Sequence, residues 1–463
     1  MTARHDREPS AVVVGGGLAG ITAALRLAEA GRRVTLVETR PRLGGLAFSF
    51  RRGELTVDNG QHVFLRCCTA YRGLIDRLGA GRLVDVQPRL DVPVLSVSPD
   101  GRRTLGRLRR AGLPVPLHLA GSLASYPHLT PADRLRVVRA ALALKGLDLD
   151  DPGLDRISFA EWLRSHGQTP ATTAALWDLV GVATLNATAE QTSLALAAMV
   201  FKTGLLSDPG ASDIGMAKVP LGDVHHDLAL AELERAGVAV RLRTRVAEVK
   251  TAEQHCVRLE GGELLTADTV VLAGAQESAA ALLPEGALEH PERLARLGHA
   301  PILNVHVVYD RRLLRQPFFA ALGSPVQWVF DRTAHSGLDV PGAQYLALSQ
   351  SAVQDEIDLP VAELRERYLP ELERLLPAAR GAEVLDFFVT RERTATFAPA
   401  PGTAALRPGP VTRVPGLLLA GSWTSTGWPA TMEGAVRSGH AAADAALAGR
   451  RRPVDRSDGR WPR

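Results

Sequence analysis

The sequence SAVVVGGGLAG at residues 10–20 decides the fold of this chain. Its first five residues form a short apolar run, which predicts a strand buried on both faces of a parallel sheet. Residues 18–30 repeat apolar side chains at helical spacing, and Gly31 follows where a C-terminal cap is expected. Residues 33–38 predict a second strand. A strand, a tight turn, a helix and a strand within about thirty residues are typical of a doubly wound α/β sheet.

The glycines between the first strand and the helix satisfy the pattern G-x-G-x-x-G of dinucleotide-binding turns. Gly15 permits the tight turn, Gly17 lets a pyrophosphate approach the backbone, and Gly20 lets the helix touch the strand. The N-terminus of the helix, at Leu18 and Ala19, supplies partial positive charge to the same phosphates. The sequence therefore predicts a dinucleotide at this turn.

Glu38, at the end of the second predicted strand, lies eighteen residues beyond the last glycine of the turn. Its carboxylate can accept hydrogen bonds from an adenosine ribose. Because this arrangement serves NAD as well as FAD, the turn and Glu38 together leave the choice of dinucleotide open.

Two later apolar runs, TVVLAG at 269–274 and GLLLAG at 416–421, can join the first two strands in one sheet. Two long insertions separate these pieces, the first rich in helical periodicity and the second in strand-like alternation. We therefore predict a dinucleotide-binding domain of residues 10–90, 215–280 and 400–447. The predicted discontinuous α+β substrate domain comprises residues 91–214 and 281–399, and the predicted flexible termini comprise residues 1–9 and 449–463.

The composition limits the classes of function. Of the 463 residues, 46% are hydrophobic and 22% charged, which is typical of a folded chain. A net charge of +4, with arginines scattered over every segment, does not indicate a nucleic-acid partner. The chain has no apolar run of about eighteen residues and no signal peptide. Cys67, Cys68 and Cys256 match neither a disulfide framework nor metal-ligand spacing, so we expect no metal and a reducing cytoplasm.

The residues after the second predicted strand favour FAD. The sequence RLGG at residues 42–45 resembles the second glycine doublet of the amine oxidase and carotenoid desaturase superfamily of flavoproteins. The resemblance implies a two-dinucleotide-type Rossmann-like domain in which Gly44 and Gly45 bring backbone toward the flavin. An arginine often follows the doublet in this superfamily. Here that position is Leu46, so its phosphate contact falls to Arg42 or to backbone.

The same resemblance implies further cofactor contacts. The sequence DNGQH at residues 58–62 stands where such enzymes pass a glycine-containing turn along the isoalloxazine ring, which places Gly60, Gln61 and His62 near the flavin. Val246, in a strand predicted over residues 243–249, matches the position whose backbone brackets adenine. Ala273 matches the small strand end below the cofactor. A core valine and a tight turn are the alternative interpretation of the last two residues.

The sequence LAGSWTSTGWPATMEGAVRSG at residues 419–439 is the most specific signature in the chain. It resembles the segment that closes over FAD in this superfamily, in which a glycine, here Gly421, precedes an acidic residue on the ribityl chain. This sequence has Ser422 instead, which implies a neutral and weaker contact. The following helix begins near Met432, and its free N–H groups are expected at the pyrimidine edge, where they stabilise negative charge on reduced flavin.

With QWVF at 327–330 and the region between Trp177 and Asn186, these motifs resemble one branch, the family of hydroxysqualene dehydroxylases, over residues 12–447. The resemblance implies that hydroxysqualene, an apolar isoprenoid, loses water and gains hydride from reduced FAD to yield squalene. It also implies neighbouring enzymes of the squalene pathway as partners, and a role in hopanoid biosynthesis.

Such a reaction needs an acid that protonates the leaving hydroxyl group, and surroundings that keep water from an allylic cation. His62 is the first candidate, because its ordinary pKa of about 6.5 permits donation near neutral pH. A hydrogen bond to flavin or backbone is the alternative role. Asp58 is the second candidate, although an Asp before Asn-Gly commonly caps a turn. Four aromatic residues are candidates to line an apolar cavity, with core packing as the alternative: Trp328, Phe330, Trp423 and Trp428.

Two other classes of function stay open from the sequence. One is a polyprenoid desaturase or amine oxidase, which would use oxidised FAD. The other is a non-enzymatic prenyl-lipid escort protein of the same fold, against which the near-intact cofactor motifs argue.

Residues 102–123 predict binding to the anionic inner face of the cytoplasmic membrane. Arginines at 102, 103, 107, 109 and 110 precede the apolar LPVPLHLAGSL at 113–123, which is too short and too rich in proline to span a bilayer. Anionic headgroups attract the first part and acyl chains the second. The alternative is a solvated hairpin followed by leucines that pack inside the substrate domain.

Overall fold

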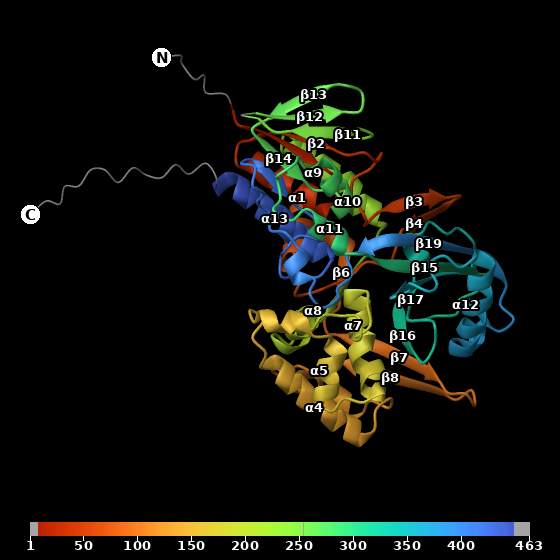
Figure 1. Ribbon diagram of the computed structural model, residues 1–463. Helices are drawn as coiled ribbons and strands as arrows, with labels where there is room; N and C mark the ends of the chain where they lie inside the picture. The colour runs from red at the N-terminus through yellow and green to blue at the C-terminus, as the bar shows by residue number, and fades with distance from the viewer. Residues whose placement is uncertain (1–7, 253, 449–463) are drawn as a thin grey trace, which may run out of the picture.

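A five-stranded parallel sheet forms the centre of the dinucleotide-binding half (Figure 1). The computed structural model describes residues 8–252 and 254–448. The strand order is β10-β2-β1-β14-β20, and every neighbouring pair is parallel. The strands are β1 Ser10–Val14, β2 Arg33–Val37, β10 Ala239–Arg241, β14 Thr269–Leu272 and β20 Leu417–Leu419. The prediction that three distant pieces of sequence share one sheet is confirmed, and with it the α/β class.

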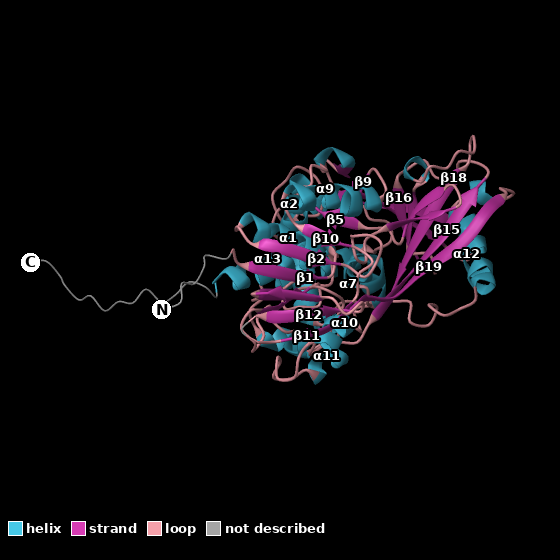
Figure 2. Cartoon of the chain, turned by 90° about the horizontal axis from the view of Figure 1, so that it is seen from above, coloured by secondary structure: helices cyan, strands magenta, loops and turns pink. Residues whose placement is uncertain are grey.

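Alternate residues of the parallel strands pack into two different hydrophobic cores, one on each face of the sheet. Val13 and Val271 pack against helices on one face, whereas Val12 and Val270 pack against a small antiparallel sheet on the other (Figure 2). The helices of the first face are α1 Leu18–Glu29, α2 Thr69–Arg77, α9 Ala229–Arg235 and α13 Met432–Ala448. The opposite face carries β11 Val246–Lys250, β12 His255–Leu259, β13 Leu264–Ala267, α10 Gln276–Leu282 and α11 Glu292–Arg296. Both faces are covered, as the continuous apolar runs require.

The strand predicted over residues 243–249 exists, but its predicted starting residue is wrong. The chain leaves the parallel sheet after β10, and Arg243 has a φ of 53°. That left-handed residue redirects the chain, so that β11 begins at Val246 in the three-stranded sheet β11-β12-β13. Apolar alternation does not reveal such a break, because it continues through the turn.

A seven-stranded sheet dominates the other half of the molecule, with the order β19-β15-β18-β17-β16-β7-β8. Its strands are β7 Asp91–Val97, β8 Arg103–Arg109, β15 Ala300–Tyr309, β16 Phe318–Leu322, β17 Trp328–Asp331, β18 Gln344–Ser351 and β19 Val384–Thr396. Both insertions therefore contribute to one sheet, in which only β16 and β7 pair in parallel among these neighbours. Helix α12 Val361–Leu375 covers one face. The exact domain boundaries stay a prediction.

The first insertion is mostly helical, as its periodicity predicted, but it opens with the hairpin β7–β8. Its helices gather at the end of the molecule opposite the three-stranded sheet (Figure 1). An aromatic core formed by Phe159, Trp177 and Phe201 holds them together. The helices are α3 Ala120–Ala124, α4 Pro131–Lys145, α5 Phe159–Ser165, α6 Pro170–Thr172, α7 Asp178–Leu185 and α8 Leu194–Phe201.

Short strands connect the two halves. The hairpin of β3 Ser49–Arg52 and β4 Leu55–Asp58 ends at the predicted flavin turn. A three-stranded sheet follows, in which β5 Val63–Leu65 and β6 Val84–Val86 both pair with β9 Ile214–Ala217.

The predicted flexible termini lie largely outside the described residues, since 1–7 and 449–463 are not described.

Candidate functional site

The three glycines of the first turn have different surroundings. Gly15 has a φ of +115°, and a Cβ there would lie 2.8 Å from the carbonyl carbon of Ala273. A Cβ on Gly20 would run into the carbonyl oxygen of Gly15. At Gly17, by contrast, the nearest atom to a Cβ would be the Cα of Gly45 at 3.7 Å. Gly15 and Gly20 thus serve chain packing, and Gly17 leaves the open space that a pyrophosphate needs.

The second glycine turn lies directly against the first. The Gly44 N–H donates to the Gly16 carbonyl at 2.9 Å, and a Cβ on Gly45 would lie 2.9 Å from the Cα of Gly17. Helix α1 begins at this junction, and its N-cap residue, Gly17, provides no side-chain hydrogen bond. The free N–H groups of the helix therefore face the space between the two turns, and this fits an anionic pyrophosphate.

Arg42 fixes the second turn from outside. Its Nη1 donates to the Gly45 carbonyl at 3.1 Å, and its guanidinium lies 3.2 Å from the centre of the Phe48 ring. Burial lowers the pKa of Arg42. Leu46, at the usual arginine position, is 47% exposed. A contact between Arg42 and a cofactor phosphate, in place of the missing arginine, stays a prediction.

Glu38 stands at the end of β2 and binds the glycine turn. Its Oε2 accepts the Gly16 N–H at 2.6 Å, and its Oε1 accepts the Arg40 N–H at 2.7 Å. A carboxylate has about four acceptor positions, so two remain for ribose hydroxyl groups. The position fits the predicted ribose contact.

We expect Glu38→Ala to weaken FAD binding by about 1 to 3 kcal/mol, the usual cost of losing charged hydrogen bonds. The dissociation constant, measured by flavin fluorescence titration of the apoprotein, checks this. Glu38→Gln keeps one acceptor oxygen and should lie between the wild type and the alanine variant. An unchanged dissociation constant in Glu38→Ala would remove Glu38 from the binding site.

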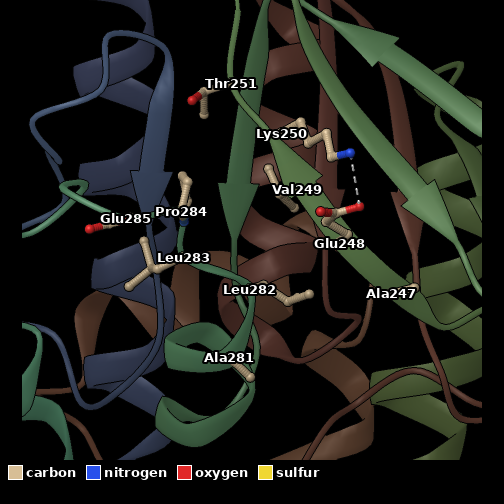
Figure 3. Close-up of a pocket in the computed structure, with 10 residues that line it drawn as sticks. All are labelled: Ala247, Glu248, Val249, Lys250, Thr251, Ala281, Leu282, Leu283, Pro284 and Glu285. Carbon is tan, nitrogen blue, oxygen red and sulfur yellow. Dashed lines mark ion pairs between the residues drawn. The ribbon is translucent and has the colours of Figure 1, made fainter.

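Val246 is buried at the first position of β11, beside the expected adenine. The residues after it line a surface hollow of about 520 Å³ together with the end of α10 (Figure 3). Within this hollow, Lys250 Nζ lies 3.6 Å from Glu248 Oε2. The hollow contains none of the glycines and none of the turn at residues 58–62, so it is separate from the candidate flavin site.

Asp58 is buried and engaged on both carboxylate oxygens. Its Oδ2 forms an ion pair with Arg332 at 2.8 Å. Its Oδ1 accepts the Ser49 hydroxyl at 2.6 Å and the Leu221 N–H at 2.9 Å. Because both carboxylate oxygens already accept hydrogen bonds from the protein, the contacts favour an anchoring role over proton donation.

Asn59 joins the two halves of the molecule. Its Nδ2 donates to the Leu46 carbonyl at 2.9 Å and to Glu392 Oε1 at 3.0 Å. Its own carbonyl accepts Asn304 Nδ2 at 3.1 Å and the Thr390 hydroxyl at 2.8 Å. The three partners from the substrate sheet did not emerge from the sequence motifs, because they are distant in sequence and become neighbours only in the fold.

His62 follows two residues later and bonds back to the same turn. Its Nδ1 lies 3.0 Å from the Gly60 carbonyl, so Nδ1 carries the proton of the neutral ring. A Cβ on Gly60 would lie 3.5 Å from His62 Cε1, so the turn and the ring are close-packed. Burial lowers the pKa of His62 below 6.5. Gln61 lines a small polar void beside Asp58.

The C-terminal motif closes around Gly421, whose N–H donates to the Ser438 hydroxyl at 2.8 Å. The Ser422 carbonyl accepts Arg407 Nη2 at 3.2 Å. Helix α13 begins at Met432. The next residue, Glu433, is fully buried and accepts the Tyr71 N–H of α2 at 2.7 Å. The N-termini of the two helices are therefore tied together here.

The four candidate aromatic residues separate into two groups. Trp423 donates from Nε1 to the Gly274 carbonyl at 3.0 Å and packs in the core, and Trp428 lies under the Arg437 guanidinium. Trp328 and Phe330 stand on β17, where they form a cluster with Phe318 at centroid distances of 5.7–6.3 Å. This second group is the one that can form an apolar wall on the substrate side.

Over residues 8–252 and 254–448, no helix is long and apolar enough to cross a membrane. In the same described part of the chain, no three side chains of His, Cys, Asp or Glu gather as metal ligands do.

Comparisons with known proteins agree with the geometry. Residues 18–447 match the family described as flavin containing amine oxidoreductase. The chain is 30% identical to a hydroxysqualene dehydroxylase of Rhodopseudomonas palustris, over 94% of this chain and 98% of that protein. It is 27% identical to a zeta-carotene desaturase of Synechocystis sp., over 95% and 97% of the two chains. The solved structure of a putrescine oxidase triple mutant has a TM-score of 0.73 at 21% identity, covering 95% and 99%, and shares the fold.

Proposed function

Since the chain belongs to the family of flavin-containing amine oxidoreductases and is an FAD-dependent oxidoreductase, we propose that it reduces hydroxysqualene to squalene. The observation that carries this proposal is the similarity to the Rhodopseudomonas palustris hydroxysqualene dehydroxylase over nearly the full length of both chains. The residues around the two glycine turns fit FAD. The open space at Gly17 and the free N–H groups of α1 would hold the pyrophosphate, and Glu38 would hold the ribose.

Bound FAD in its reduced form supplies the hydride. His62 would give the proton of its imidazolium, from Nε2, to the leaving hydroxyl oxygen of the substrate. The C–O bond would then break, water would leave and the allylic carbon would take up the hydride, so that one proton and one hydride convert the alcohol to the hydrocarbon and water. The faces of Trp328 and Phe330 would exclude water and stabilise developing positive charge.

The direct test is incubation of the purified protein with hydroxysqualene and reduced FAD under nitrogen. We expect squalene, detected by mass spectrometry, together with oxidised flavin. The second candidate function is a desaturase, which the similarity to zeta-carotene desaturase favours. Incubation with a polyene precursor and oxidised FAD tests it. A desaturated product there, without squalene from hydroxysqualene, would replace the first proposal by the second.

We also propose two kinds of partner besides the substrate. They are an anionic membrane surface, on the inner face of the cytoplasmic membrane, and neighbouring squalene-pathway enzymes. A hydrocarbon product that is insoluble in water favours transfer along a membrane. In support, Leu113 and Leu117 are 49% and 53% exposed. Arg107 and Arg110 are engaged in ion pairs with Asp91 and Asp213, however. The arginines available to lipid are therefore those at 102, 103 and 109.

We expect the protein to co-sediment with anionic vesicles at low salt and to be released as salt rises, because the attraction is screened. Changing Arg102, Arg103 and Arg109 to Glu should abolish this binding. The matched control changes Arg245, Lys250 and Arg258 to Glu, in and directly before the three-stranded sheet at the other end of the molecule, with the same change of net charge. Equal loss in both triple variants would mean a non-specific charge effect. Wild-type protein that stays in the supernatant would reject the membrane proposal.

A further inference from the structure

A chain of buried polar groups runs through the substrate sheet to the flavin turn. The Thr390 hydroxyl on β19 donates to the Asn59 carbonyl, so it must accept its other bond, from His306 Nε2 at 3.1 Å. His306 therefore carries its proton on Nε2. Its Nδ1 accepts the Tyr345 hydroxyl at 2.7 Å. The geometry fixes the direction of every bond from Tyr345 to Asn59.

His306 is held rigidly in this chain. It is fully buried on β15, and its ring stacks on Phe388 with 4.5 Å between centroids and 9° between planes. Burial lowers the pKa of His306 to about 3, so the ring stays neutral throughout the working pH range. A neutral ring whose two nitrogens are both hydrogen-bonded holds its partner strands, β18 and β19, in fixed positions.

The chain of bonds cannot serve as a proton path. It ends on the Asn59 amide carbonyl, and a peptide carbonyl has no proton to pass on and is a very weak base. What the chain can transmit is position. Asn304 Nδ2 donates to the same carbonyl, so strands β15 and β19 of the substrate sheet both hydrogen-bond to one peptide group.

We propose that Thr390 and His306 are positioning residues for His62. The Asn59–Gly60 peptide is planar, so the bonds that hold the Asn59 carbonyl also fix the positions of the Gly60 nitrogen and Cα. The Gly60 carbonyl in turn accepts the Nδ1 proton of His62, which sets the direction in which Nε2 points. The substrate sheet thus sets the orientation of an acid that belongs to the FAD half, and this inference rests on the proposed role of His62.

Thr390→Val removes the hydroxyl and keeps the shape of the side chain. In the holoenzyme with prereduced flavin, we expect kcat to fall about tenfold, the equivalent of one buried hydrogen bond, with KM unchanged. Thr390→Ser restores the hydroxyl and should restore kcat. If Thr390 served stability alone, all three proteins would have the same kcat whenever they are folded.

The second readout does not depend on activity. Nitrogen NMR of holoprotein labelled at the histidine ring nitrogens should show the Nδ1–H form of His62, with His62→Gln used for assignment. In Thr390→Val, we expect a mixture of Nδ1–H and Nε2–H forms. An unchanged tautomer and an unchanged kcat would overturn the positioning proposal. If the tautomer changes in Thr390→Val but His62→Gln keeps full turnover, positioning stands and the acid role of His62 fails.

Tyr309→Phe provides the matched control. Tyr309 is buried on the same strand as His306, but it packs in the opposite core, against α12. We expect its loss of a hydroxyl to leave both the His62 tautomer and kcat unchanged. If Tyr309→Phe lowers kcat as much as Thr390→Val does, the effect is general loosening of the sheet, and the proposal is rejected.

Discussion

Gly17→Val abolishes FAD retention while the protein still folds. The backbone at Gly17 has φ −75° and ψ 176°, an extended conformation that valine adopts without strain. The nearest atom to its Cβ would be 3.7 Å away, so the Cβ itself meets no clash with the chain. The space that valine fills is the space of the pyrophosphate, and its methyl groups would also cover the free N–H groups of α1. The flavin absorbance of the purified protein, relative to protein concentration, measures retention.

Variants of two other glycines serve as controls for this result. Gly20→Val should destabilise the fold, because its Cβ would meet the Gly15 carbonyl, and thermal unfolding detects this. Gly31→Ala, just beyond the far end of α1, has open space but a φ of +73°, so it should lose some stability to backbone strain and still keep its flavin. Stoichiometric flavin in Gly17→Val would contradict the assignment of this turn to the cofactor.

His62→Ala keeps the flavin spectrum and loses turnover by about a hundredfold or more, the usual range for general acid catalysis. The assay uses flavin that is already reduced, so that a redox defect is not mistaken for a protonation defect. Because burial lowers the pKa of His62 below 6.5, the imidazolium forms only as the pH falls through that lowered pKa. Wild-type turnover should therefore rise toward acid pH, and His62→Ala should lose this dependence.

His335→Ala is the control for this experiment. His335 lines the small void beside Asp58, and burial lowers its pKa as it lowers that of His62. The backbone hydrogen bond that acts on its pKa comes from Lys218 rather than from Gly60, so we expect its variant to keep the pH profile. If His62→Ala retains turnover, or retains the rise toward acid pH, another group protonates the substrate.

The parts that the sequence predicted are those determined by local rules. The turn at Gly15, the helix after it and the small-residue end at Ala273 follow from strand, turn and helix patterns within short windows. The break at Arg243 escaped prediction because one left-handed residue interrupts an otherwise continuous apolar pattern. From the sequence, the hairpin β7–β8 is only one of two alternatives, because its arginines fit a solvated strand as well as a lipid surface.

The partners of the flavin turn were missed because they lie on strands far away in sequence. One signal for them was present, however. In β15, Asn304 and His306 interrupt an apolar strand at two alternate positions, which places two polar side chains on one buried face. A buried polar face requires hydrogen-bonding partners, so this pattern predicts a network even before its partners are known.

The parallel pairing of β7 with β16 constrains the order of events during synthesis. Val94 of β7 pairs with Ala320 of β16, and both belong to the buried part of the sheet. On the ribosome the second strand emerges roughly 225 residues after the first, which at about 5–20 residues per second is roughly 10–45 seconds. During that interval the apolar edge of β7 has no partner strand. Strands β10 and β14 of the parallel sheet are therefore synthesised while this edge of β7 is open to chaperones and to aggregation, and the last strand of that sheet, β20, emerges only after β16.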